Sequence, residues 1–157
     1  MKTGTVIIGL GNPQLTDDGV GMAVANEIAR RSGIDDLTLL ELNSGGIRLM
    51  EAMAGYRRAV VVDAMLTGAK PGTVRRFDPE DFVTTKNSYS SHDTDFGTAF
   101  QAGLLLGIPL PELVSFWGVE AQECGVFSEE LSAVVAAAVP LAAELIVNEL
   151  MSTEAMR

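Results

Sequence analysis

Three short apolar runs alternate with amphipathic stretches in the first part of the chain. Residues 5–10 form a continuous apolar run that ends in glycine, residues 37–42 form a second run, and residues 58–65 are the most β-branched stretch of the sequence. Runs of this kind are typical of strands buried on both faces of a sheet. Between them, residues 17–31 and 45–53 repeat apolar side chains at helical spacing. This strand–helix order predicts parallel strands joined by right-handed crossovers.

The remaining pattern predicts two more strands and two more helices. Residues 73–77 carry two arginines and alternate as an edge strand does. A helix is expected at 94–106 and a strand around 112–118. The last helix is expected at 128–151, with Ser128 as its N-cap. Its predicted apolar stripe consists of Leu131, Val134, Val135, Ala138, Leu141, Leu145 and Ile146.

Together these elements predict an α/β fold, a three-layer sandwich with a mostly parallel central sheet flanked by helices. We expect a single domain over residues 1–151 and a flexible tail at 152–157, because no linker composition interrupts the pattern. Residues 78–93 show no clear period and are rich in Ser, Thr and Asn. Loops of this length are usually functional or mobile.

Charge and cysteine content narrow the class of protein. The 157 residues include 11 Lys and Arg against 21 Asp and Glu, a formal net charge of −10, which repels phosphate backbones and excludes nucleic acid as a partner. The single cysteine, Cys124, excludes an internal disulfide and fits a reducing compartment. The apolar run "AVVAAAVPLAA" contains Pro140 and is too short to cross a bilayer. We therefore expect a soluble cytoplasmic protein without a membrane partner.

Several acidic residues and the one histidine should meet at one edge of the sheet. In open parallel sheets, ligands bind beyond the carboxyl ends of the strands. Asp17 and Asp18 follow the first strand, Asp63 lies at the carboxyl end of the third, and His92 belongs to the long loop before the next helix. Imidazole together with oxygen donors is compatible with nickel or zinc. The convergence of three segments predicts a metal site.

Each of these residues also has a purely structural interpretation. An aspartate at a helix start can cap free N–H groups, which we favour for Asp17, whereas the two interpretations weigh equally for Asp18. A carboxylate beside a buried strand end is costly without a role, which favours function for Asp63. A single histidine in a Ser-rich loop is more often solvated, so only the convergence favours His92 as a ligand.

The glycine turn in "IIGLGNPQLTDDGVG" (7–21) first suggests a phosphate site. The dinucleotide fingerprint requires a glycine where Gln14 stands, and Pro13 lacks an N–H that a phosphate would use. Glu41, near the end of the second strand, stands where a ribose-binding acid could lie. A nucleotide-binding module is therefore an alternative, which the two aspartates disfavour.

Nucleophilic catalysis has weak support. Ser90 and Ser91 adjoin His92, but no nucleophile-elbow sequence places a serine on a sharp strand-to-helix turn. Cys124 could face the same histidine, although a structural thiol is the favoured interpretation.

Two families share motifs with this chain. "IIGLGNP" resembles the start of peptidyl-tRNA hydrolases, but residues 16–19 read Thr-Asp-Asp-Gly where that family has the stretch with its catalytic histidine, and the resemblance stops at Pro13. A second resemblance covers nearly the whole chain. "GLGNPQLTDDGVG", "VVVDAM", "SSHDTDFGTAF" and "WGVE" agree in order and spacing with the maturation endopeptidases of nickel–iron hydrogenases.

The second resemblance implies a function as well as a fold. It implies that Asp18, Asp63 and His92 contact the metal and carry catalysis, and that Asp17 matches a neighbouring acid that is not a ligand. The implied cofactor is nickel, presented by the substrate rather than held permanently. The implied partner is the precursor of a hydrogenase large subunit, from which a monomeric enzyme removes a C-terminal extension. A non-cleaving metal-sensing assembly chaperone on the same fold and a peptidyl-tRNA hydrolase-like esterase are the alternatives.

Overall fold

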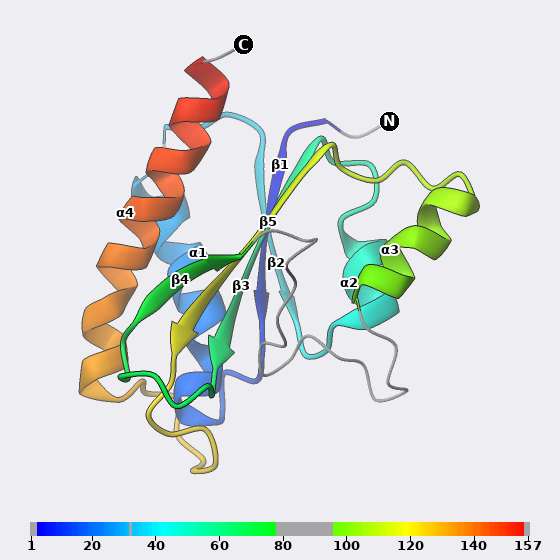
Figure 1. The fold of residues 1–157 in the computed structure, drawn as a ribbon. Helices are drawn as coiled ribbons and strands as arrows, with labels where there is room; N and C mark the ends of the chain where they lie inside the picture. Colours follow the sequence, from blue (N-terminus) through cyan, green and yellow to red (C-terminus); the bar gives the residue numbers. More distant parts are fainter. Residues whose placement is uncertain (1–2, 32, 78–95, 156–157) are drawn as a thin grey trace.

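A sheet forms the middle layer of the molecule, and helices cover both of its faces (Figure 1). The computed structural model describes residues 3–31, 33–77 and 96–155. Within these residues the sheet has five strands in the order β2-β1-β3-β5-β4, of which only β4 runs antiparallel to its neighbour. The three-layer, mostly parallel α/β sandwich predicted from the sequence is thereby confirmed. The strands are β1 (Thr5–Leu10), β2 (Leu37–Leu42), β3 (Arg58–Met65), β4 (Val74–Phe77) and β5 (Leu113–Glu120).

Two hydrophobic clusters bind the helices to the two faces of the sheet. One cluster joins α1 and α4 to one face, and the other joins α2 and α3 to the opposite face (Figure 1). β1 and β3 are buried along their whole length, as expected for central strands covered on both sides. The helical elements are the 3-10 helix η1 (Thr16–Gly19), α1 (Val20–Arg31), α2 (Gly46–Ala52), α3 (Phe96–Leu105) and α4 (Ala133–Ala155).

The helix expected at 17–31 is divided, because its first residues form the separate turn η1 and α1 begins only at Val20. Asp17 and Asp18 therefore do not lie in the first turn of the α-helix. Both are buried in η1, where Asp17 accepts hydrogen bonds from the distant loop after β5 and Asp18 accepts one from Asn12 N–H in the loop after β1. These tertiary contacts outweigh the helical preference of the local sequence.

The last helix begins and ends later than predicted. Ser128 is not its N-cap: its backbone pairs with Leu15, and its hydroxyl accepts a hydrogen bond from Glu130 N–H in the preceding loop. Helix α4 runs to Ala155, into the segment expected to be a tail. Residues 156–157 lie outside the described residues.

The buried face of α4 also differs from the predicted stripe. Leu141 and Leu145 are exposed. Small side chains take the inward positions because they let the helix approach α1 and the sheet closely. The fully buried residues of this face are Val135, Ala142, Ala143 and Ile146, with Ala138 and Leu150 nearly so.

One helix in the described part of the chain has the length and composition of a membrane span. This apolar segment, Ala133–Ser152, is 20 residues long and therefore longer than the run that the sequence analysis judged too short. In the structure, however, this helix packs along α1 and contacts β4 and β5. About a third (33%) of the apolar window within this segment is buried, so part of its apolar composition serves contacts within the domain.

Candidate functional site

The loop after β1 brings Asp18 to the carboxyl edge of the sheet, beside the end of β3. β1 pairs with β3 in parallel up to Gly9 and Val62, after which β1 ends at Leu10 while β3 continues beside β5 to Met65. Gly11 then adopts φ 124°, a conformation that L side chains rarely adopt, and turns the chain across the edge. The turn η1 that follows contacts both β1 and β3.

Direct contact between backbones fixes where α1 starts. A Cβ atom on Gly21 would lie 2.3 Å from the Val62 carbonyl oxygen, and one on Gly9 would lie 2.6 Å from the Met22 nitrogen. Both distances are far below a van der Waals contact, so neither position tolerates a side chain. The glycines of the opening motif thus serve close helix–strand packing and a sharp turn rather than phosphate binding.

Asp18 is held by its own loop. Its side chain is 2% exposed, and Oδ2 accepts a hydrogen bond from Asn12 N–H at 3.0 Å. Asn12 also fixes the turn through its side chain, because Oδ1 accepts a hydrogen bond from Gln14 N–H at 2.9 Å. This geometry orients the carboxylate before any ligand arrives.

Asp63 lies within β3 itself, close to the carboxyl end of the strand at Met65. Its side chain is 1% exposed, and Oδ1 accepts a hydrogen bond from Ala64 N–H at 2.8 Å. Gly118 of β5 is its partner in the register. An acid this deeply buried needs polar or cationic partners, so Asp63 retains the features that favour a functional role.

Asp17 has a structural role, as favoured from the sequence. Its fully buried carboxylate accepts hydrogen bonds from Gln122 N–H and Glu123 N–H and two more from Ser132. Ser132 immediately precedes α4, so Asp17 secures the start of that helix rather than the start of α1. The loop between β5 and α4 is thereby tied to the residue next to Asp18.

Glu120 is a buried acid that the sequence analysis did not select. It closes β5, is 2% exposed, and accepts hydrogen bonds from the Thr67 N–H and hydroxyl at 2.9 and 2.6 Å. The signal was present, because "LVSFWGVE" ends an apolar strand with an acid just as "AVVVD" does. Glu120 braces the loop after β3 and so supports the edge on which Asp63 lies.

The third predicted ligand, His92, lies outside the described residues, as do Ser90 and Ser91. Among residues 3–31, 33–77 and 96–155, no three His, Cys, Asp or Glu side chains are grouped so that they could hold a metal ion. The described part of the edge thus contributes two oriented carboxylates. Cys124 is half-buried and packs against the α1–α4 side of the core, which agrees with its interpretation as a structural thiol.

Comparison with protein families identifies the chain. The model of the family described as hydrogenase maturation protease matches residues 22–149. The chain belongs to the hydrogenase maturation proteases. The family resemblance and the enzyme class expected from the sequence are both confirmed.

Individual relatives agree with this assignment. The hydrogenase expression/formation protein HupD of Rhizobium leguminosarum bv. viciae is 25% identical over 94% of this protease and 74% of its own length. HupD of Bradyrhizobium diazoefficiens is 30% identical over 65% of this chain, and the match spans about half (55%) of that relative. The hydrogenase maturating endopeptidase HybD from E. coli has the same fold, with a TM-score of 0.75 and 23% identity over 98% of this protease and 94% of its own chain.

Proposed function

We propose that this protease removes a C-terminal extension from the nickel-loaded precursor of a nickel–iron hydrogenase large subunit. The observation that carries the proposal is the pair of buried carboxylates, Asp18 and Asp63, each oriented by a backbone N–H at the carboxyl edge of the sheet. In this proposal both residues and His92 contact the nickel that the substrate brings.

The donor set accounts for a metal that travels with the substrate. Two carboxylates and one imidazole are compatible with nickel, but they provide three ligands and no thiolate. A shell of this kind binds a free ion less tightly than a closed four-ligand site and leaves positions for ligands from elsewhere. Cysteines of the precursor fill those positions in our proposal, so tight binding requires a loaded precursor.

The chain's own residues would position the substrate for hydrolysis. Asp18 and Asp63 approach from two different segments, so a group held between them is fixed relative to the sheet edge. A cation bound there supplies Lewis acidity, which polarises the scissile carbonyl and lowers the pKa of a bound water. The buried setting strengthens these electrostatic effects, because the local dielectric is low.

The cellular setting forms part of the proposal. We propose a cytoplasmic monomer whose partner is the precursor, without nucleic acid or membrane partners. The formal net charge of −10 supports the exclusion of nucleic acid.

The decisive experiment mixes the protease with nickel-loaded and metal-free preparations of one precursor and follows the mass of its C-terminal extension. We expect trimming of the loaded precursor only. Equal trimming of both preparations would contradict metal sensing. Binding of the loaded precursor without trimming would identify the non-cleaving assembly chaperone instead.

A further inference from the structure

The loop between β5 and α4, residues 121–132, carries two exposed apolar side chains. It projects beyond the carboxyl ends of the strands at the lower end of the molecule (Figure 1). Phe127 is 81% exposed and Val126 is 55% exposed. Exposed apolar side chains grouped beside a functional site often mark a surface that meets a partner.

This loop is fixed, although its tip is exposed. Thr16 donates its N–H to the Ser128 carbonyl and its hydroxyl to the Val126 carbonyl, and Ser128 N–H donates to the Gln14 carbonyl. Phe127 is thus flanked on both sides by residues bonded to the segment that carries Asp18. Because the loop is ordered before any partner arrives, binding through it loses little conformational entropy.

A third exposed apolar side chain follows the other proposed ligand. Leu66, three residues after Asp63, is 58% exposed. The residues on either side of it bond to the end of β5 and the start of loop 121–132: Met65 accepts a hydrogen bond from Ala121 N–H, and Thr67 donates to Glu120. Exposed apolar side chains therefore lie on the segment that is bonded to the Asp18 turn and on the segment that directly follows Asp63.

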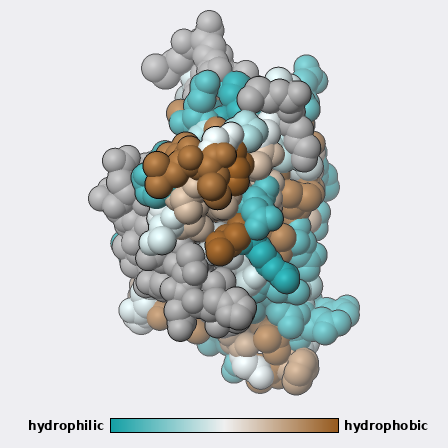
Figure 2. All heavy atoms as spheres, turned by 90° about the vertical axis from the view of Figure 1, so that its right-hand side faces the viewer, coloured by the Kyte–Doolittle hydropathy of each residue, from teal (hydrophilic) through white to brown (hydrophobic). Residues whose placement is uncertain are grey.

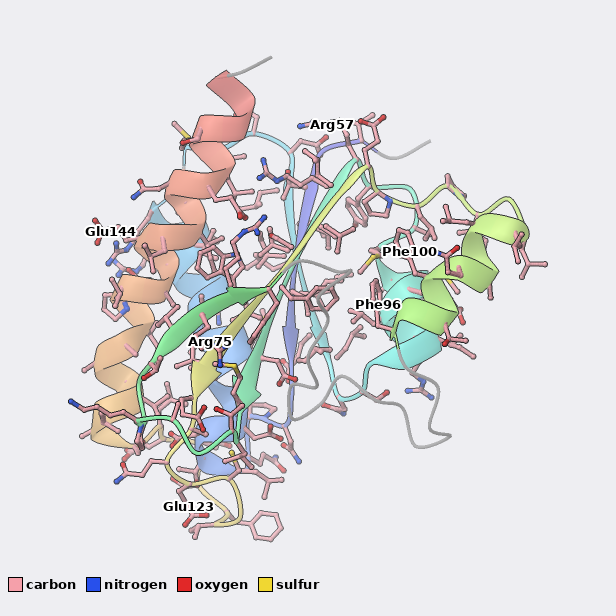
Figure 3. All side chains as sticks on the ribbon, viewed as in Figure 1. Arg57, Arg75, Phe96, Phe100, Glu123 and Glu144 are labelled. Atoms are coloured by element: carbon pink, nitrogen blue, oxygen red, sulfur yellow. The ribbon has the colours of Figure 1, made fainter. Side chains whose placement is uncertain are left out.

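The charge of the loop specifies the chemistry of its partner. Glu123, Glu129 and Glu130 are exposed in it, and residues 121–132 include no Lys or Arg. Glu123 lies at the lower end of the molecule in Figure 3. An aromatic tip among negative charges is complementary to an apolar pocket bordered by basic side chains.

We infer that loop 121–132 is a docking element for the precursor, with Phe127 as the anchor that enters an apolar pocket bordered by Lys or Arg. The inference rests on the proposed function, because it takes the precursor as the partner. Contact through the loop would hold the precursor beside Asp18 and Asp63 without relying on the metal alone, and would select the correct protein by shape and charge.

A second exposed apolar surface provides a matched control. Leu104, Leu105 and Leu106 are 49%, 88% and 78% exposed at the end of α3, where Figure 2 shows apolar side chains gathered on the upper part of that face. The segment after them belongs to the opposite edge of the sheet, because Pro109 accepts a hydrogen bond from Gly55 N–H ahead of β3. Leu105→Ala therefore removes a comparably exposed apolar side chain far from the proposed site.

The test measures trimming kinetics of the loaded precursor for the wild type, Phe127→Ala and Leu105→Ala. We expect Phe127→Ala to raise KM about tenfold or more with little change in kcat, because an anchor contributes to binding rather than to the reaction. Leu105→Ala should behave as the wild type. Both variants should keep the wild-type melting temperature, since both side chains are exposed.

A second variant tests the charge complementarity. Glu129→Gln combined with Glu130→Gln should raise KM at low salt and weaken the dependence of KM on salt. An unchanged KM for Phe127→Ala, or equal effects of Phe127→Ala and Leu105→Ala, would overturn the docking inference while leaving the protease activity established.

The docking inference can also be tested if the wild type fails to trim. Direct binding of the same loaded precursor, measured by calorimetry, should then weaken about tenfold for Phe127→Ala and remain unchanged for Leu105→Ala. Loss of trimming with this binding pattern would reject the proposed function and retain the docking element. Equal binding by the wild type and Phe127→Ala would reject the docking element.

Discussion

Ser132 donates two hydrogen bonds to the carboxylate of Asp17, one from its backbone N–H and one from its hydroxyl, each 2.8 Å long. Two more reach the same carboxylate from Gln122 and Glu123 N–H. A single fully buried side chain thus joins η1, the loop after β5 and the start of α4.

Replacing Asp17 should therefore destabilise the whole domain. Asp17→Ala removes the fully buried acceptor of four part-buried hydrogen bonds, and we expect the free energy of unfolding in urea to fall by about 2 kcal/mol or more. Ser132→Ala removes only the hydroxyl donor and should cost about 1 kcal/mol. Equal losses for the two variants would show that the backbone donors find other partners.

Asp63→Asn should lower the rate at which the loaded precursor is trimmed by about 100-fold or more, while the fold persists. The substitution keeps the shape of the side chain and the acceptor for Ala64 N–H but removes the anionic ligand. Circular dichroism and mass analysis of the precursor measure the two effects. We expect the same from Asp18→Asn and His92→Ala, and wild-type trimming by any of the three would exclude that residue from the mechanism.

Cysteine or serine chemistry should not be required. Cys124→Ser and Ser91→Ala should both trim the loaded precursor at rates within about threefold of the wild type, because we assign no nucleophile to the protein. The same mass assay measures these rates. Loss of cleavage in a folded Cys124→Ser variant would revive a thiol mechanism.

Gly21→Ala should unfold or strongly destabilise the protein. The added Cβ atom would lie 2.3 Å from the Val62 carbonyl oxygen, which belongs to a central strand and cannot move aside. We expect a loss of about 3 kcal/mol or more in the free energy of unfolding. Gly33→Ala is the matched control, because its Cβ atom meets nothing within 4 Å, and it should change stability by less than about 0.5 kcal/mol.

Elements governed by local pattern were predictable from the sequence. The ranges 37–42 and 58–65 match β2 and β3 at both ends, because β-branched and aliphatic runs in a parallel sheet carry their own signal. The edge position of β4 was likewise visible in its two arginines. The placement of Asp18 and Asp63 near the carboxyl ends of the strands followed from topology, because ligands of parallel sheets bind there, whereas His92 lies outside the described residues.

Features that depend on distant contacts were not predictable. The start of α4 is set by Asp17, more than a hundred residues earlier in the chain, so Ser128 was a better local N-cap candidate than the observed start. Leu141 and Leu145 outrank alanines in hydrophobicity, yet both are exposed while Ala142 and Ala143 are fully buried, because the contacts of α4 with α1 and the sheet decide which face turns inward. The acid that closes β5 was visible in the sequence, but the role of Glu120 in holding the loop after β3 was not, because its partner Thr67 lies 53 residues earlier in the chain.

The contacts of Gly9 and Gly21 limit which amino-acid substitutions this protein can accept during evolution. Where α1 crosses the sheet at these glycines, the backbone of the helix contacts the backbone of the strands directly, and no side chain lies between them. We expect this backbone contact to hold the spacing between α1 and the sheet when other core side chains change. The position of Asp18 should therefore be insensitive to substitutions in the rest of the core. If Gly9, Gly21 and the core positions near them are randomised together, folded variants should keep glycine at these two positions and accept several residues at the others.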